Sequence, residues 1–159
     1  MPLLPNVLQA ELLNLDSDGG AKDVAAAAGK WFNAWWTYAQ NMTYLVPGGG
    51  GRPLVESSFK GILLAGLSPS TDATLFFTML GTAMTAAWAT LGTPASLTPP
   101  ILSLIPAPAP FGPMAAPVVP VGLAASNKAI PRTLLATLIH TWTITIQAVG
   151  PSGPVGPIS

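Results

Sequence analysis

Residues 73–91 have the sequence ATLFFTMLGTAMTAAWATL, and this uncharged stretch between Asp72 and Gly92 decides the fold. It has 19 residues and no proline, a length that suits either a long buried helix or a helix across a bilayer. On a helix its side chains divide into two stripes. The small stripe consists of Thr74, Thr78, Thr82, Thr85 and Ala89, and the large apolar stripe consists of Phe76, Phe77, Leu80, Met84, Trp88 and Leu91. This division predicts a helix packed between neighbouring parts of the protein, and it also fits a membrane helix that packs through small residues.

Two features of the surrounding sequence favour burial in protein over burial in a membrane. No cluster of Lys or Arg flanks residues 73–91, so the charge asymmetry that orients membrane helices is missing. The next apolar stretch is interrupted by proline throughout and cannot form a second spanning helix. We therefore expect a core helix at 73–91. The alternative is a small integral membrane protein, holin-like or part of a membrane complex, that spans the bilayer at 73–91.

The composition excludes several classes of function. The chain has 159 residues, with six Lys or Arg, six Asp or Glu, one His and no Cys, and this length is typical of one domain. Zero net charge gives no positive surface for nucleic-acid phosphates, so no nucleic-acid contact is expected. Without Cys there are no disulfides, thiolate metal sites or cysteine nucleophiles. Only 8% of residues are charged, against about 25% in typical proteins, which is too few to cover an independent soluble monomer.

The charged residues are unevenly distributed along the chain. Ten of the twelve precede residue 73, and none lies between Ala73 and Asn127 or after Arg132. The uncharged region is therefore where protein partners are expected. The first residues lack the basic region of a signal peptide, so the chain is expected to be made in the cytoplasm and either kept there or released by lysis.

Three more helices are predicted before residue 73, at 6–15, 21–45 and 54–67. The second contains KDVAAAAGKWFNAWWTYA, in which strong helix formers precede aromatic residues at three- and four-residue spacing. Two adjacent aromatic stripes make this helix apolar around most of its circumference, as in a helix that is buried on several sides. Its candidate interface side chains are Trp31, Trp35 and Trp36.

The segment 93–125 holds nine of the 18 prolines and many large apolar side chains. Proline at this density disfavours helix and central strand and leaves an extended or irregular backbone. Apolar side chains on such a segment are strongly driven to be covered. We expect an extended arm that clasps neighbouring subunits, with candidate interface residues Leu102, Ile105, Phe111, Val118 and Val119.

A helix is predicted to begin near Asn127, and residues 141–149 then alternate between apolar and polar side chains, which is typical of a β-strand. A single strand needs a partner, and we expect that partner in the Pro-rich segment or in another subunit. The candidate interface residues here are Trp142, Ile144 and Ile146. Residues 150–159, GPSGPVGPIS, are expected to form a Pro/Gly tail.

The sequence contains no pattern that indicates catalysis, and no enzymatic activity, cofactor, metal or small-molecule substrate is expected. His140 is the only imidazole, and a polar or helix-capping role is favoured for it. Asp16, Asp18 and Asp23 lie close in sequence, but the spacing of a calcium-binding loop is not met. No G-x-S-x-G motif supports the remaining alternative, a small hydrolase.

Three stretches together resemble the small structural proteins of tailed-phage particles and of related contractile injection systems. They are KDVAAAAGKWFNAWWTYA, the Gly/Pro-rich middle, and TLLATLIHTWTITIQAV followed by GPSGPVGPIS. The resemblance implies a non-enzymatic virion component of the capsid decoration, neck, tail or baseplate. It would be assembled in the host cytoplasm, with copies of itself and other particle proteins as partners.

The predicted fold is mainly α: a small helical bundle with an extended Pro-rich apolar arm and a C-terminal β-strand. Residues 1–92 are expected to form the helical part, residues 93–125 the arm, and residues 126–159 the C-terminal helix, strand and tail. The three parts are expected to make one structural domain.

Overall fold

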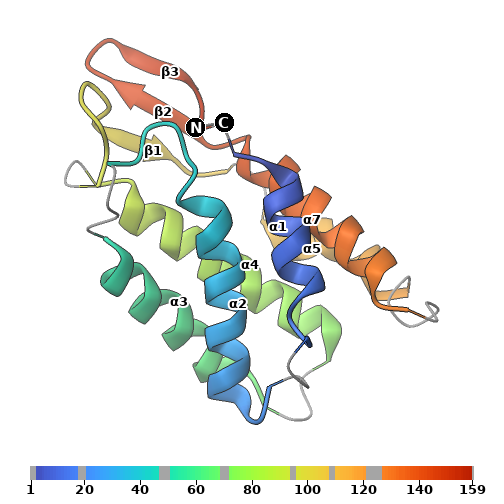
Figure 1. Ribbon diagram of the computed structural model, residues 1–159. Helices are drawn as coiled ribbons and strands as arrows, with labels where there is room; N and C mark the ends of the chain where they lie inside the picture. The colour runs from blue at the N-terminus through green and yellow to red at the C-terminus, as the bar shows by residue number, and fades with distance from the viewer. Residues whose placement is uncertain are drawn as a thin grey trace.

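The computed structural model describes residues 3–17, 21–46, 51–68, 72–93, 96–107, 110–120 and 127–158. Its helices pack together, and a small three-stranded sheet lies at one end, close to both ends of the chain (Figure 1). The helices are α1 (Pro5–Leu13), α2 (Val24–Ala39), α3 (Arg52–Gly66), α4 (Ala73–Leu91), α5 (Phe111–Ala115) and α7 (Ala129–Thr143), with one further helical turn at 118–120. The strands are β1 (Ser103–Ile105), β2 (Gln147–Gly150) and β3 (Gly153–Pro157). The predicted fold class, mainly α with a minor β component, is confirmed.

Two aspartates begin the two central helices. The Asp23 carboxylate accepts a hydrogen bond from the Ala26 N–H at 2.7 Å, and Asp72 accepts one from the Leu75 N–H at 2.8 Å. Each carboxylate thus satisfies a backbone donor that the first helical turn leaves without a partner. The α4 helix covers residues 73–91, as the sequence predicts. The α2 helix ends six residues earlier than predicted, because residues 44–46 instead pair with residues 96–98.

Helices α2, α3 and α4 meet at a cluster of aromatic rings. The ring centroid of Trp35 lies 5.5 Å from that of Phe59 on α3 and 5.2 Å from that of Trp88 on α4. Phe32 also contacts Phe59, at 5.6 Å. These four side chains are at most 2% exposed. The aromatic stripe of α2 therefore forms the chain's own core.

The described part of the Pro-rich segment packs on the rest of the chain, which corrects the prediction of an extended arm. It supplies β1 and α5, and Phe111 and Val118 are covered by the same chain, whereas Leu102 and Ile105 stay exposed. The ring of Phe111, for example, contacts Trp142 of α7 at 5.8 Å. Proline is tolerated because β1 contains none, and Pro113 occupies the first turn of α5, where an N–H has no helical partner. Residues 94–95, 108–109 and 121–125 of the predicted arm lie outside the described residues.

The C-terminal strand begins later than predicted. Residues 141–143 continue α7, and β2 covers only residues 147–150. The reason is that Leu135, Ile139 and Trp142 prolong the buried stripe of α7 at helical spacing, which outweighs the alternation of the threonines. β2 pairs antiparallel with β1, so the strand's partner is the Pro-rich segment, one of the two predicted possibilities.

The Pro/Gly tail adds a third strand to this sheet. β3 pairs antiparallel with the other edge of β2, after a turn in which Gly153 has a φ of +113°. Only glycine adopts this backbone conformation without strain. The residues predicted as a tail are therefore largely part of the sheet.

Two glycines allow α4 and α5 to cross closely. A Cβ atom at Gly112 would lie 2.9 Å from the Thr78 Cα, and one at Gly81 would lie 3.0 Å from the Phe111 Cβ. Distances this short are sub-van-der-Waals contacts. In the first of them the neighbour is backbone, which cannot move aside as a flexible side chain can.

We expect Gly112→Ala to lower the free energy of unfolding by about 1–3 kcal/mol, because the added methyl group forces α5 away from α4. Gly61→Ala on α3 is the matched control, since nothing lies within 4 Å of its Cβ position. That change should leave stability unchanged or raise it by up to about 1 kcal/mol through helix propensity. Urea unfolding of the three proteins measures both effects. Equal stability of Gly112→Ala and the unmodified protein would contradict the close crossing.

Candidate functional site

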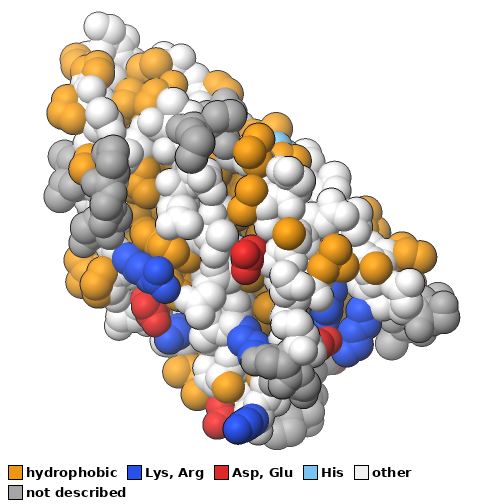
Figure 2. Space-filling view, viewed as in Figure 1, with side chains coloured by type: hydrophobic (Ala, Val, Ile, Leu, Met, Phe, Trp, Pro, Cys, Tyr) orange, Lys and Arg blue, Asp and Glu red, His pale blue; other side chains and the backbone are white. Residues whose placement is uncertain are grey.

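The charges of the described chain are confined to one part of the molecule. Figure 2 shows Lys, Arg, Asp and Glu side chains on the helices and none over the sheet. The segments that build the sheet end, 40–46, 96–107 and 144–158, contain no charged residue on any face. The uneven charge distribution of the sequence is therefore also a spatial separation, with a charged helical part and an uncharged sheet end.

The uncharged end exposes four large apolar side chains. Val46, Leu102, Ile105 and Val155 are 36%, 49%, 44% and 55% exposed, and together we call them the sheet-end surface. The loop that carries Val46 is held next to the segment leading into β1, because the Val46 N–H donates to the Ser96 carbonyl at 3.0 Å. Leu102 precedes the short edge strand β1, Ile105 is the last residue of that strand, and Val155 lies in β3. An uncharged surface with exposed apolar side chains is typical of a protein–protein contact.

The eleven side chains predicted for the interface fall into three groups. Six are at most 4% exposed in this single chain and belong to its own core: Trp35, Trp36, Phe111, Val118, Trp142 and Ile146. Three are partly buried: Trp31, Val119 and Ile144. Two are exposed: Leu102 and Ile105. For the first group the prediction of interface residues is corrected, because side chains that the chain itself covers are not available to a partner.

Sequence reasoning missed Val46 and Val155 at the sheet-end surface. Val46 follows a helix and precedes a glycine run, so nothing local places it beside β1. Val155 lies between Pro154 and Gly156 in a segment that carries no strand periodicity. Both depend on pairing between distant parts of the chain.

An apolar groove lies between α2, the start of α4, the helical turn at 118–120 and the start of α7. It has a volume of about 260 Å³ and we call it the Trp31 groove. Trp31, Phe76 and Val119 lie along it, and it is also lined by Lys128, which precedes α7, and by Arg132 in the first turn of α7. Two of the predicted interface residues, Trp31 and Val119, thus meet here rather than at the sheet end.

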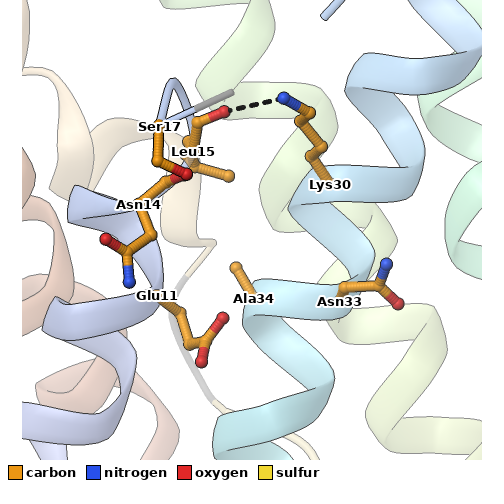
Figure 3. A pocket seen from close by; sticks show the side chains of 7 residues that line it. All are labelled: Glu11, Asn14, Leu15, Ser17, Lys30, Asn33 and Ala34. Atoms are coloured by element: carbon orange, nitrogen blue, oxygen red, sulfur yellow. Dashed lines mark hydrogen bonds between the residues drawn. The ribbon is translucent and has the colours of Figure 1, made fainter. Parts of the chain in front are cut away.

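A small polar pocket of about 180 Å³ lies between α1 and α2 (Figure 3). The Lys30 ammonium donates to the Leu15 carbonyl at 3.1 Å, so it holds the chain after α1 against α2. Asn33 points away from α1, and its amide oxygen accepts a hydrogen bond from Arg52 at 3.1 Å. The Glu11 carboxylate lies between the two helices. The geometry of the pocket favours a structural link between helices.

His140 lies in the last turn of α7 and contacts Tyr38 of α2. The Tyr38 hydroxyl and the His140 Nδ1 are 2.8 Å apart. Burial raises the pKa of Tyr38, an effect that the nearby Thr143 hydroxyl partly opposes. Burial also lowers the pKa of His140, which favours the neutral imidazole, and its Nδ1 can then accept a hydrogen bond that the Tyr38 hydroxyl donates. The contact joins α2 to α7 and includes no carboxylate.

The clustered aspartates of the sequence have separate roles. Asp16 pairs with Lys128 at 2.9 Å and with Arg132, whereas Asp23 caps α2. Asp18 lies outside the described residues. Within the described ranges, no group of three or more His, Asp and Glu side chains is close enough to hold a metal ion.

The protein should lose stability as the pH falls from 7.5 to 5, and His140 should cause much of that loss. The fold lowers the pKa of His140 from 6.5, so the unfolded chain binds more protons than the folded chain in this range. The free energy of unfolding therefore decreases as the pH decreases. Melting temperatures of His140→Gln should decline less between these pH values than those of the unmodified protein.

Asp16→Asn provides the control for this pH profile. Hydrogen bonds from Lys128 and Arg132 lower the pKa of Asp16 below 3.8, so its contribution is lost only in more acidic solution. This variant should keep the decline between pH 7.5 and 5. A decline in His140→Gln as large as in the unmodified protein would assign the effect to other groups.

Comparison of the chain with models of known protein families, with curated proteins and with solved structures finds no match.

Proposed function

We propose that this protein is a non-enzymatic structural subunit of a large symmetric particle of the tailed-phage type. In this proposal the sheet-end surface contacts copies of the chain or other particle proteins. The observation that carries the proposal is the absence of charge from the segments that build the sheet end, combined with four exposed apolar side chains there.

The physical argument concerns solubility and the composition of interfaces. Charged residues are depleted from the centres of protein interfaces, because a charge buried there loses its hydration and is destabilising unless an opposite charge pairs with it. A surface made for permanent contact with water gains from charges, which oppose association. The charged helical part of this chain fits exposure to water, and the sheet end fits coverage by another protein.

The assignment to a virion rests on the resemblance of the sequence to small phage structural proteins. A chain with 8% charged residues and an apolar end is suited to an assembly in which each copy is surrounded by neighbours. Within this proposal the protein is assembled in the host cytoplasm and resides in the capsid decoration, neck, tail or baseplate. It acts through contacts with protein and requires no cofactor.

One observation favours a second candidate, the small integral membrane protein. Among the described residues, α4 is the one helix long and apolar enough to cross a membrane, although core helices of soluble proteins pass the same test. Trp88 of its large stripe contacts the Trp35 ring of α2, and its exposed stripe carries threonines. Thr78 and Thr82 each donate to the carbonyl four residues earlier at 3.0 Å, which would satisfy these hydroxyls in lipid as well. A membrane role would need the bundle to open or α4 to present the threonine stripe to lipid.

Native mass measured by light scattering in detergent-free buffer tests the proposal. The protein should be soluble and larger than the 16.2 kDa of one chain. Leu102→Glu combined with Ile105→Glu should reduce the mass to that of a monomer, because it places two desolvated charges in the contact. Leu64→Glu on α3 is the control: Leu64 is 45% exposed, close to the 49% of Leu102, but lies on a charged helix. That variant should keep the native mass.

Circular dichroism of each variant confirms that the fold is retained. A soluble monomer of the unmodified chain would contradict the assembly proposal. A chain that is extracted only with detergent would favour the membrane protein instead.

A further inference from the structure

We propose that the Trp31 groove binds a small amphipathic anion, namely a medium-chain aliphatic or an aromatic carboxylate. This inference is independent of the sheet-end surface, because it rests on a different part of the fold. The groove combines an apolar interior with two cations at its rim.

The interior of the groove is built from aromatic and branched side chains of separate elements. The rings of Trp31 on α2 and Phe76 on α4 lie 5.0 Å apart and are tilted by 56°. Phe76 also contacts Phe77, at 5.5 Å. Val118 and Val119 line the groove from the turn at 118–120, and Val118 is buried at 4% exposure. Because Trp31, Phe76 and Val119 are only partly buried by the chain, the groove offers apolar surface that a ligand can cover.

A second hollow of about 380 Å³ shares Trp31, Ala73 and Phe76 with the groove. The Trp31–Phe76 pair therefore separates two adjoining apolar hollows. An aliphatic chain longer than the groove can continue past this pair. The groove volume of about 260 Å³ is at the small end of ligand pockets, which fits a short chain or one aromatic ring.

The rim supplies the polar part of the site. Lys128 and Arg132 line the groove, and none of the described residues that line it is a carboxylate. Both cations contact the same oxygen, Oδ2 of Asp16, so two positive charges share one negative charge. Asp72 caps α4 nearby, and its carboxylate accepts the Leu75 N–H. The four groups together carry no net charge, so an anionic headgroup must be recognised by a cation that exchanges Asp16 for the ligand.

The two cations differ in their freedom to reach a ligand. The Arg132 side chain is 17% exposed and also donates to the Leu13 carbonyl at 3.3 Å, so it is fixed between α1 and α7. The Lys128 side chain is 75% exposed. Lys128 can therefore turn from Asp16 toward a carboxylate in the groove while Arg132 keeps Asp16 in place. This assigns recognition of the headgroup to Lys128 and recognition of the apolar part to Trp31 and Phe76.

Titration with decanoate and with decanol, both below their micelle concentrations, tests the site. Calorimetry should show that decanoate binds about tenfold more tightly than decanol, since only the carboxylate pairs with Lys128. Binding should also change the intrinsic tryptophan fluorescence, and Trp31→Phe should remove most of that change and weaken the binding of decanoate and decanol alike.

Lys128→Gln should bring the affinity for decanoate down to that for decanol and leave decanol binding unchanged. Lys60→Gln removes the same charge from a lysine that pairs with Glu56 on α3, and it should bind decanoate as the unmodified protein does. Thermal melts of each variant without ligand check that the fold is intact.

Three outcomes would overturn the proposal. The first is equal binding of decanoate and decanol by the unmodified protein, and the second is unchanged decanoate binding by Lys128→Gln. The third is a tryptophan fluorescence that changes with protein concentration but does not change when decanoate is added. That result would identify a second copy of the chain as the occupant of the groove.

Discussion

The contact of Trp35 with Phe59 and Trp88 is the interaction on which the rest of the structure depends. It joins three helices at one point, with ring centroids 5.5 and 5.2 Å apart. The indole N–H groups of Trp35 and Trp88 are buried there without a hydrogen-bond partner among the described residues. Leaving such a donor unpaired costs about 1–3 kcal/mol, so packing of the rings must outweigh this penalty. Aromatic packing, rather than polar bonding, therefore fixes α4 in the centre of the fold.

Because α4 is fixed in this way, α5 and β1 of the uncharged half of the chain can pack against it. α3 and the aromatic residues of α2 pack against α4, and α5 crosses α4 closely at Gly81 and Gly112. The Pro-rich segment then places Phe111 and Val118 in the core. At the sheet end, Val46, Leu102, Ile105 and Val155 stay exposed in segments that carry no charge.

Sequence patterns predicted the elements whose signals are local. The bounds of α4 follow from Asp72, the uncharged stretch and Gly92, and the aromatic stripe of α2 follows from its spacing. The limits of prediction appear where a partner decides the outcome. The threonines at 141 and 143 alternate as in a strand, yet Trp142 is drawn into the core beside Phe111, and this contact prolongs α7. Likewise, sequence shows that Phe111 must be covered but not whether its own chain or another covers it.

The two candidate sites lie at opposite ends of α4. Ala73 and Phe76 at its start border the Trp31 groove. Gly92, which follows its last residue, lies against Leu104 of β1: a Cβ atom built on Gly92 would be 3.3 Å from the Leu104 Cβ. A helix of 19 residues is about 28 Å long, which is well beyond the distance at which substitutions usually couple. Effects of changes at Lys128 and at Leu102 should therefore add independently. A coupling between them would mean that α4, packed rigidly among α2, α3 and α5, transmits a displacement from one end of the molecule to the other.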